Sequence, residues 1–445
     1  MRAMTIEAEN ATTQESGAGG SGRGLGAPWP AHCAIDEQGH LVIGGCDLVE
    51  LAREFGTPAY VYAEDDMRDR AREYLRAFSE YGGDTEILFA SKAFPATAAY
   101  RLFREEGLSV DVASAGELHM ALSAGFDPER IHMHGNAKGA DELRAAFEAG
   151  VGTIVLDSLD EIELAESLLD RPQRALIRLT PGVHGDTHAY ISTGEEDAKF
   201  GLGIADGVAA EAVERLRGCE HLDLVGLHAH IGSQLFELEP FERAAQAVAE
   251  FARSVDFEPE IVNLGGGLAI AYLDGQEPPS IDSYAKAKCA AARDAFGDGP
   301  RVVVEPGRSL VGNAGVTLYE VVSVKGAGER TYVAVDGGMS DNLRPMLYDA
   351  RYTARLADRA SQPGEASVTV AGKHCESGDV LIEEVTLPSP QRGDLLVTPA
   401  TGAYGHAMAN NYNGVPRPPV IFCSEGEARE VVRRETVEDL TARDA

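Results

Sequence analysis

Basic residues are scarce in this chain of 445 residues, which has 39 lysines and arginines against 72 aspartates and glutamates and a formal net charge of −33. Binding along nucleic acid requires clustered cations that neutralise phosphates, and docking on an anionic membrane surface requires a basic patch. The composition therefore disfavours both roles. Net charge bears on partners and solubility rather than on fold, so the fold has to be inferred from the residue pattern.

Cysteine pairs and long apolar runs are also missing. The six cysteines form no Cys-x-x-Cys pair and show no spacing typical of a metal site, which favours reduced thiols. Residues 1–10 lack the apolar segment of a secretion signal, and no run approaches the roughly 18 apolar residues of a membrane span. We therefore expect a soluble, cytoplasmic protein without a bound metal.

The beginning of the chain is rich in small and polar residues. Residues 11–30 (ATTQESGAGGSGRGLGAPWP) contain many glycines and serines and few apolar side chains. Such a segment cannot bury enough surface to offset the entropy lost on ordering. We predict a disordered tail over residues 1–30.

An alternation of strand-like and helix-like segments begins near residue 85. Apolar or β-branched runs recur at intervals of about 22 residues, and helical patterns fill the gaps between them. The runs begin at Ile87, Ser109, Ile131, Thr153, Ala175, Leu222, Glu260 and Arg301. Strands that alternate with helices pair in parallel, and eight such units over about 250 residues predict a (β/α)8 barrel over residues 59–310. An open, doubly wound sheet is the alternative that this pattern leaves.

The alternation stops after residue 311, where strand-like runs follow one another with turns and without regular crossover helices. The runs are 315–324, 330–335, 366–372, 379–387 and 394–399. This pattern predicts a second, antiparallel β-sandwich or β-barrel domain over residues 311–445. We expect residues 31–58 to join that domain and residues 426–445 to form a charged surface helix.

The residues with the most distinctive chemistry lie where predicted barrel strands end, which is where α/β barrels carry their active sites. The first strand ends at Lys92, one of seven lysines in the chain. A lysine at the barrel mouth has to be paired or desolvated, and we expect a lowered pKa that makes its amine a nucleophile toward carbonyl groups. A structural ion pair is the alternative.

Three other strand ends carry complementary groups. His228 and His230 share one face of the sixth strand, where they could stack on a planar ring, bind a metal or fill the core. The seventh strand ends in three glycines at 265–267, whose backbone N–H groups can approach an anion closely. The eighth ends at Glu305 and Arg308, which can bind a basic ring nitrogen and a phosphate or carboxylate, or can pair with each other.

Together these groups match one cofactor. It would present an aldehyde to the lysine, a phosphate to the glycines, a flat ring to a histidine and a basic nitrogen to Glu305. Pyridoxal 5′-phosphate has all four features. A metal-dependent barrel hydrolase would leave the three glycines and the EPGR run at 305–308 unexplained.

Several separated motifs resemble a known family. The runs FASKAFP (89–95), HAHIGSQ (228–234), GGG (265–267) and EPGR (305–308) resemble the fold-type III pyridoxal-phosphate decarboxylases. The later runs RPMLY (344–348), CESGD (375–379) and GAYGHAMANNYNG (402–414) are similar to the diaminopimelate decarboxylase family in particular. The resemblance extends from about residue 32 to the C-terminus and implies the alanine racemase-like combination of a barrel with a β domain.

The resemblance implies roles for individual residues. Lys92 and Cys375 would be the catalytic residues, with Lys92 bound covalently to the cofactor and Cys375 donating a proton from the partner subunit of a homodimer. The cofactor would contact Lys92, His230 on the ring face, Ser233, Gly265, Gly266 and Gly267 near the phosphate, Glu305 at the ring nitrogen, Pro306, Gly307, Arg308 and Tyr404. The substrate would contact Arg308, Arg344, Tyr348, Glu376 and Tyr404.

The resemblance further implies decarboxylation of meso-2,6-diaminopimelate to L-lysine and CO2. The non-reacting end of this substrate carries an ammonium and a carboxylate, and Arg308 and Arg344 together with Glu376 offer groups of both signs. A related decarboxylase acting on ornithine, arginine, carboxynorspermidine or a carrier-linked amino acid is one alternative, and a non-catalytic binding protein is another. An alanine racemase places an arginine against the ring nitrogen, so Glu305 opposes that reading.

Two stretches depart from the pattern of the family. The run RLTP at 178–181 replaces the commoner RVNP, and AKFG at 198–201 replaces SKFG. Both border residues 181–201, which the resemblance implies to be a lid over the site. The departures therefore concern the packing of the lid rather than the reaction.

Overall fold

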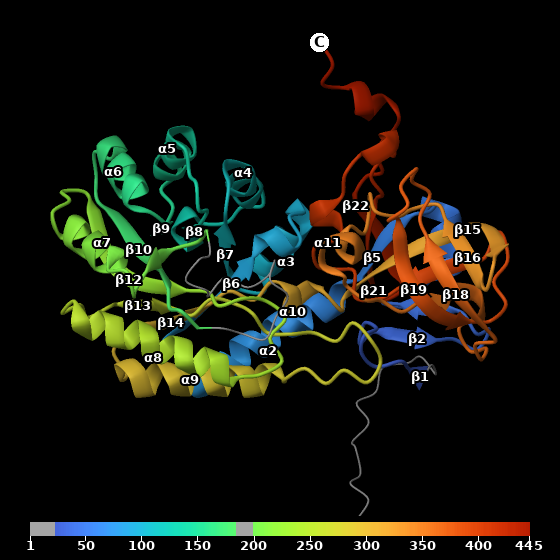
Figure 1. The fold of residues 1–445 in the computed structure, drawn as a ribbon, viewed down its shortest axis with the longest axis horizontal. Helices are drawn as coiled ribbons and strands as arrows, with labels where there is room; N and C mark the ends of the chain where they lie inside the picture. The colour runs from blue at the N-terminus through green and yellow to red at the C-terminus, as the bar shows by residue number, and fades with distance from the viewer. Residues whose placement is uncertain (1–22, 184–198) are drawn as a thin grey trace, which may run out of the picture.

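The computed structural model describes residues 23–183 and 199–445. The chain forms two parts (Figure 1), a barrel ringed by helices on the left and a β domain on the right. The β domain combines the first described strands, drawn in blue, with the last third of the chain, drawn in orange and red. The predicted tail up to residue 22 and the greater part of the predicted lid, residues 184–198, lie outside the described residues.

Eight parallel strands close into the barrel that the alternating pattern predicts. They are β6 (Thr85–Ala90), β7 (Ser109–Val112), β8 (Ile131–Met133), β9 (Thr153–Leu156), β10 (Gln173–Thr180), β12 (Leu222–Ala229), β13 (Ile261–Asn263) and β14 (Arg301–Val304). The pairing of β9 with β10 closes the ring, and the short β11 (Leu202–Gly203) extends the sheet beside β10. The closure confirms the barrel and excludes the open sheet.

Helices follow the strands and cover the outside of the barrel. They are α2 (Glu64–Gly82), α3 (Thr97–Glu105), α4 (Ala115–Ser123), α5 (Ala140–Ala149), α6 (Leu159–Leu168), α7 (Val208–Arg217), α8 (Glu239–Ser254), α9 (Ile281–Phe296) and the short α10 (Arg308–Val311). Serines cap the starts of three of them, because Ser114, Ser158 and Ser280 accept hydrogen bonds from backbone N–H groups in the first turns of α4, α6 and α9.

The interior of the barrel is layered along its axis. Six buried side chains form an apolar cluster in its middle: Leu88, Val155, Leu176, Val225, Ile261 and Val303. Because side chains two residues apart on a strand share a face, the residues two positions before and two positions after each of these also point inward. Polar groups therefore occupy both ends of the barrel, and the apolar layer separates them.

The β domain is built around the long strand β15 (Gly315–Ala327). Its sheet runs in the order β19-β18-β16-β15-β5-β21-β22; in addition, β20 pairs with β15, and β17 pairs with β20. The remaining strands are β5 (Ala59–Ala63), β16 (Arg330–Val335), β17 (Arg355–Leu356), β18 (Ala366–Ala371), β19 (Val380–Leu387), β20 (Leu395–Thr398), β21 (Val420–Ser424) and β22 (Glu427–Val432). Most pairs are antiparallel as predicted, but β16 pairs with β18 and β5 pairs with β21 in parallel.

The first described residues form a small sheet that packs on this domain. It contains β1 (Arg23–Gly24), β2 (Cys33–Ile35), β3 (Leu41–Ile43) and β4 (Cys46–Asp47), followed by α1 (Leu48–Phe55). Residues 23–30 were expected to belong to the disordered tail, yet β1 pairs with β2 and Trp29 is only 3% exposed. Trp29 joins an apolar cluster with β5 and β15, so burial of its large side chain offsets the ordering entropy of its small neighbours.

Two further expectations differ from the structure. Residues 59–63 were assigned to the barrel, but β5 pairs with β15 and β21, so the barrel part begins with α2. The predicted C-terminal surface helix is wrong, because residues 427–432 form β22 on the edge of β21 and residues 438–441 form only a short 3-10 turn. The open edge of β21 supplies backbone partners that the isolated segment lacks, and such long-range pairing overrides local propensity.

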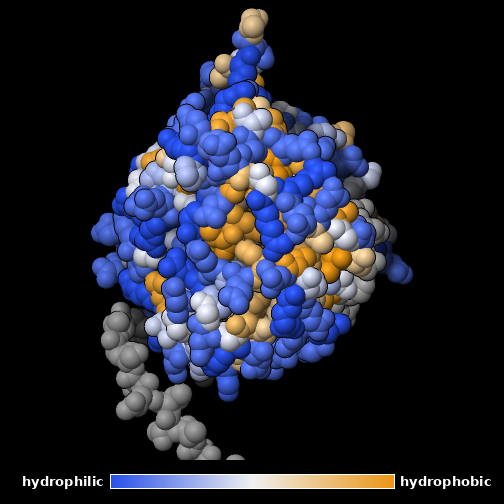
Figure 2. Space-filling view, turned by 90° about the vertical axis from the view of Figure 1, so that its left-hand side faces the viewer, coloured by the Kyte–Doolittle hydropathy of each residue, from blue (hydrophilic) through white to orange (hydrophobic). Residues whose placement is uncertain are grey.

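The outer surface of the barrel is mostly polar. Figure 2 shows the left-hand side of Figure 1, where hydrophilic residues dominate and apolar residues gather in patches near the middle. Among the described residues, no helix is both long enough and apolar enough to cross a bilayer.

Candidate active site

A cavity of about 320 Å³ lies at the carboxyl ends of the barrel strands, against the β domain. Ten of the predicted site residues line it: Lys92, His230, Ser233, Gly266, Gly267, Glu305, Gly307, Arg308, Tyr348 and Tyr404. It adjoins a second cavity of about 360 Å³, which shares the side chains of Lys92, His230 and Glu305 with it. The structure thus gathers residues that lie up to 312 positions apart in the chain into one hollow.

Lys92 follows β6 in a short 3-10 turn (Ser91–Ala93), and its side chain is exposed to the cavity. Burial by surrounding protein lowers its pKa, but Asp111, Tyr404 and Glu305 outweigh burial, so the pKa is raised above its usual value. The expected lowering is therefore wrong. Asp111 lies near the carboxyl end of the neighbouring strand β7, and burial raises the pKa of its carboxyl well above the usual range. The free protein holds a charged amine beside this carboxyl.

Glu305 follows β14 and is held from two sides by imidazoles. Its Oε1 lies 2.9 Å from His134 Nε2 and accepts a 2.7 Å hydrogen bond from Asn263 Nδ2, while its Oε2 lies 3.3 Å from His228 Nε2. Burial raises the pKa of the Glu305 carboxyl, but the two imidazoles dominate and hold it well below its usual range. Burial lowers the pKa of His228 to about 4, so this histidine is neutral near pH 7 and donates to the carboxylate.

These contacts answer two questions that the sequence left open. Glu305 pairs with histidines rather than with Arg308, and His228 serves the carboxylate while His230 lines the cavity. His134, His228 and Glu305 lie close enough together to share a metal ion. The hydrogen-bonding arrangement instead leaves an ionised carboxylate at the cavity wall, which suits a protonated ring nitrogen.

The glycine loop, residues 265–267, follows β13 and passes very close to neighbouring backbone. A Cβ atom on Gly266 would lie 2.3 Å from the Glu305 carbonyl oxygen, and one on Gly267 would lie 2.7 Å from the Gly232 carbonyl oxygen. Gly267 also has a φ of 113°, a conformation that other residues rarely adopt. Glycine is therefore required here, and it exposes backbone along the cavity wall. An amine, a carboxylate and a glycine loop around one cavity fit pyridoxal phosphate.

Two arginines and two aromatic rings form a chain of contacts from the cavity into the β domain. Arg308 Nε and Nη2 donate to Ser233 Oγ at 3.2 and 3.1 Å, and its Nη1 donates to the hydroxyl of Tyr272. The Arg308 guanidinium lies 4.8 Å from the ring centre of Tyr404, and the Arg344 guanidinium lies 4.4 Å from that of Tyr272. Arg344 starts α11 (Arg344–Tyr348) and is buried beside the cavity rather than in its lining.

Cys375 and Glu376 are exposed on the β domain and are absent from the described lining of both cavities of their own chain. The loop that carries them is nevertheless fixed. The Cys375 N–H donates to Asn413 Oδ1 at 2.9 Å, and Asp379 accepts from the backbone and Nδ1 of His374 at 2.9 and 2.8 Å.

Two predicted cofactor residues lie just behind the cavity lining. The Gly265 N–H donates to Asn263 Oδ1 at 2.9 Å, and the Pro306 carbonyl accepts from the Ala90 N–H at 3.0 Å. Both therefore shape the backbone that carries their neighbours. Phe200, at the described edge of the predicted lid, lines both cavities, and the Arg178 guanidinium lies 4.5 Å from its ring centre.

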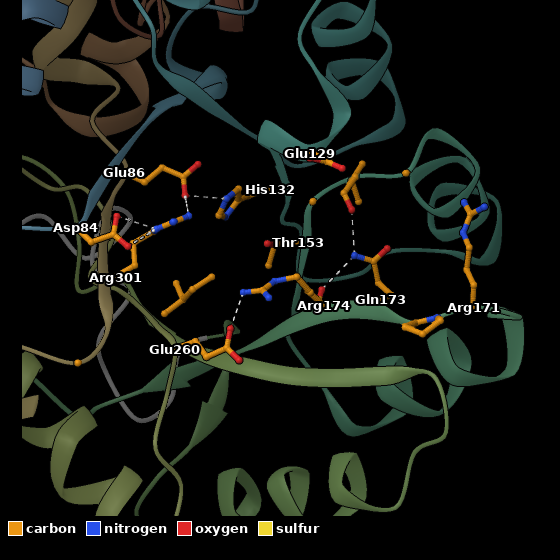
Figure 3. Close-up of a pocket in the computed structure, with 16 residues that line it drawn as sticks. Asp84, Glu86, Glu129, His132, Thr153, Arg171, Gln173, Arg174, Glu260 and Arg301 are labelled. Atoms are coloured by element: carbon orange, nitrogen blue, oxygen red, sulfur yellow. Dashed lines mark hydrogen bonds and ion pairs between the residues drawn. The ribbon is translucent and has the colours of Figure 1, made fainter.

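A larger cavity of about 810 Å³ opens at the opposite, amino end of the barrel (Figure 3). Its charged groups pair with one another, Arg301 with Asp84 at 3.1 Å and Arg174 with Glu260 at 3.0 Å. The apolar layer separates it from the Lys92 cavity, and its described lining contains no predicted site residue. Its size alone therefore does not mark it as the active site.

Sequence reasoning missed several groups of the site. Asn263, Asp111, His134 and Tyr272 all contact or surround predicted site residues, and each lies at or just beyond a strand end or in a loop. For the first three, position at the carboxyl end of a barrel strand was an available signal. Tyr272 lies in the loop after the glycines, and nothing in its local sequence distinguishes it.

Comparisons with known proteins indicate the family of this chain. Residues 64–312 match the family of pyridoxal-dependent decarboxylases over its pyridoxal-binding domain. The chain is 47% identical over 422 residues to the diaminopimelate decarboxylase of Bacillus subtilis (strain 168), covering 92% of this chain and 96% of that one. It is 48% identical over 424 residues to that of Actinosynnema pretiosum subsp. auranticum, covering 94% and 95%. The crystal structure of the enzyme from M. jannaschii in co-complex with L-lysine matches with a TM-score of 0.87 at 33% identity, covering 94% and 98%.

The barrel, the Lys92 cavity and the family match define a pyridoxal-dependent decarboxylase of the barrel type. Nearly half of the aligned residues are identical to those of two diaminopimelate decarboxylases, over almost the full length of both relatives. This similarity identifies the family more closely. The chain belongs to the diaminopimelate decarboxylase family.

Proposed function

We propose that this protein decarboxylates meso-2,6-diaminopimelate to L-lysine and CO2, with pyridoxal 5′-phosphate bound at Lys92. The observation that carries the proposal is one cavity that combines a lysine amine, a carboxylate held ionised by histidines and a glycine loop. The names of the relatives and the L-lysine bound to the M. jannaschii structure support the choice of substrate and product.

Different residues around the cavity would hold different parts of the cofactor. Pyridoxal phosphate, when bound, supplies an aldehyde that combines with the α-amine of the substrate and a ring that takes up the electron pair left by CO2. The amine of Lys92 would hold the cofactor covalently at its aldehyde carbon. Glu305 keeps a proton on the ring nitrogen, His230 covers the ring face, and the glycine loop with Ser233 binds the phosphate.

The distal end of the substrate requires groups of both signs. Arg308 and Arg344 can bind its carboxylate, because a guanidinium donates two parallel hydrogen bonds to a carboxylate. Glu376 of a second subunit can bind its ammonium. Tyr348, in the cavity lining, bounds the space between them. A substrate with a lone terminal ammonium, such as ornithine, leaves both arginines without an anionic partner.

We also propose that the enzyme is a homodimer with two shared sites. Cys375 is exposed on a hydrogen-bonded loop, and the large apolar side chains exposed on the same domain include Leu347 at 40% and Tyr412 at 42%. The Tyr412 ring stacks on that of His374, the neighbour of Cys375, at 5.8 Å. Burial of these groups against a second copy would bring Cys375 to the partner's Lys92 cavity. Six free cysteines favour a reducing compartment, which supports the cytoplasm.

Substrate choice provides the first test. We expect CO2 release and stoichiometric L-lysine from meso-2,6-diaminopimelate in the presence of pyridoxal phosphate, and at least about a hundredfold lower kcat/KM with ornithine or arginine, because charged groups of the site would be left unpaired. Carbon dioxide capture and amino-acid chromatography measure both products. Comparable turnover of ornithine would assign the chain to a sister decarboxylase.

Removing the charge of Glu305 tests the hold on the ring nitrogen. In Glu305→Gln we expect the cofactor to remain attached to Lys92 while kcat falls roughly 10²–10³-fold, the usual effect of losing one stabilising group in an enclosed site. Steady-state assays and the visible absorbance of the cofactor measure the two effects. Glu86→Gln is the matched control, since Glu86 is a carboxylate paired with a histidine at the opposite end of the barrel. An unchanged kcat in Glu305→Gln would contradict the role.

A further inference from the structure

A fully buried lysine lies behind the glycine loop. Lys288 belongs to α9, is 1% exposed, and directs its ammonium at three consecutive backbone carbonyls. Its Nζ donates to the carbonyls of Leu264, of Gly265 at 2.9 Å and of Gly266 at 3.4 Å. No carboxylate among the described residues forms an ion pair with it. The mechanism above makes no use of this charge.

Aromatic rings complete the surroundings of Lys288. Its Nζ lies 4.7 Å from the ring centre of Phe241 and 4.9 Å from that of Tyr284, and the Tyr284 hydroxyl donates to the Gly266 carbonyl at 3.1 Å. Rings stabilise a nearby cation, but an unpaired buried ammonium is still costly. Burial lowers the pKa of Lys288 to about 7, against the attraction of Glu305 and Cys289. Packing alone does not explain a lysine here, since an apolar side chain would fill the same space without that cost.

The carbonyl contacts fix the direction of the loop's N–H groups. In a trans peptide the C=O of one residue and the N–H of the next point in opposite directions. Lys288 holds the carbonyls of residues 264–266 toward α9, so the N–H groups of residues 265–267 face away from α9. The Gly265 N–H donates to Asn263 Oδ1, and the Gly266 N–H points to His230 Nδ1 at 3.3 Å. The N–H groups of Gly266 and Gly267 are therefore the ones carried by residues of the cavity lining.

We propose that Lys288 is a positioning residue for the phosphate of the cofactor. It orients the glycine loop from behind, and its charge adds to the attraction that the N–H groups exert on an anion. A dianion on the other side of the loop in turn favours the charged lysine. The inference rests on the proposed function, because the anion is the phosphate of pyridoxal 5′-phosphate. Lys288 thereby determines the preference for the phosphorylated cofactor over pyridoxal.

The test compares two forms of the cofactor that differ only in the phosphate. Apoprotein of the wild type and of Lys288→Met is titrated with pyridoxal 5′-phosphate and with pyridoxal, and the Kd of each is measured by absorbance. We expect the Kd for pyridoxal 5′-phosphate to rise roughly 10- to 100-fold, the range for hydrogen bonds that involve a charge, while the Kd for pyridoxal stays unchanged. Inorganic phosphate should also compete less well in the variant.

Two further variants separate the contributions. Lys286→Met replaces an exposed lysine two positions away on α9 and should leave both affinities at the wild-type value. Lys288→Gln keeps a donor without the charge, so its Kd for pyridoxal 5′-phosphate should lie between those of the wild type and Lys288→Met. This variant is also the measurement to use if Lys288→Met does not fold.

Three results would overturn the inference. An unchanged Kd for pyridoxal 5′-phosphate in the Lys288 variants would show that Lys288 does not position the phosphate. An equal loss of affinity for both forms would reduce Lys288 to a support of the fold. A wild-type protein that does not prefer pyridoxal 5′-phosphate to pyridoxal would contradict the proposed function as well, and only this result affects both.

Discussion

Replacing Lys92 with alanine is expected to abolish covalent attachment of pyridoxal phosphate and to lower kcat by at least roughly 10²–10⁴-fold, the range for loss of a positioned proton-transfer group. Among the described residues that line the two cavities at the carboxyl end of the barrel, Lys92 is the one lysine. This described lining therefore offers no second lysine that could take over the aldehyde. The variant should still bind the cofactor without a covalent bond, because the glycine loop and Glu305 remain in place.

Borohydride reduction makes the Lys92 result directly measurable. Reduction fixes an aldehyde to the amine that holds it, so the wild-type protein should gain the mass of the cofactor on the peptide containing Lys92. Lys92→Ala should gain none, whereas Lys286→Ala, which removes an exposed lysine, should behave like the wild type. A cofactor adduct on any other lysine would contradict the assignment.

The barrel, and the position of Lys92 and Glu305 in one cavity at its mouth, follow from the sequence because the pattern itself is regular. Strands of β-branched residues recur at a fixed interval, and chemically distinctive residues such as Lys92 and Glu305 stand at their carboxyl ends. In a parallel barrel these ends converge on one mouth. Knowing the strand ends is therefore almost enough to know which side chains meet.

What the sequence could not supply depends on neighbours from other strands. The pKa of Lys92 is raised by Asp111 on β7 and by Glu305 after β14, and no local pattern reveals their approach. Glu305 is likewise held ionised by His134, which follows β8, and by His228 on β12. Both histidines are distant from Glu305 in the chain. The strand β22 depends on the edge offered by β21 rather than on its own propensity. Each of these is a long-range contact.

Replacing Cys375 with alanine is expected to preserve the cofactor and to slow product formation by roughly 10²–10⁴-fold, because the Cα proton then lacks its donor. Loss of CO2 precedes this proton transfer. We therefore expect a burst of about one CO2 per site, followed by slow turnover, in a rapid-mixing experiment. Cys219→Ala, which removes a half-buried thiol at the far end of α7, is the control and should turn over at the wild-type rate. Full turnover by Cys375→Ala would contradict the role.

Mixing two inactive variants shows which subunit supplies the thiol. In a dimer of Lys92→Ala with Cys375→Ala, a shared site built from Lys92 of one subunit and Cys375 of the other is intact at one of its two positions. If the site used both residues of one chain, neither position would be intact. Random reassociation of equal amounts should therefore restore about a quarter of the wild-type activity for a two-fold symmetric dimer with shared sites. Activity that stays at the level of the separate variants would place Cys375 in its own chain's site, against the outward position that it occupies on the β domain.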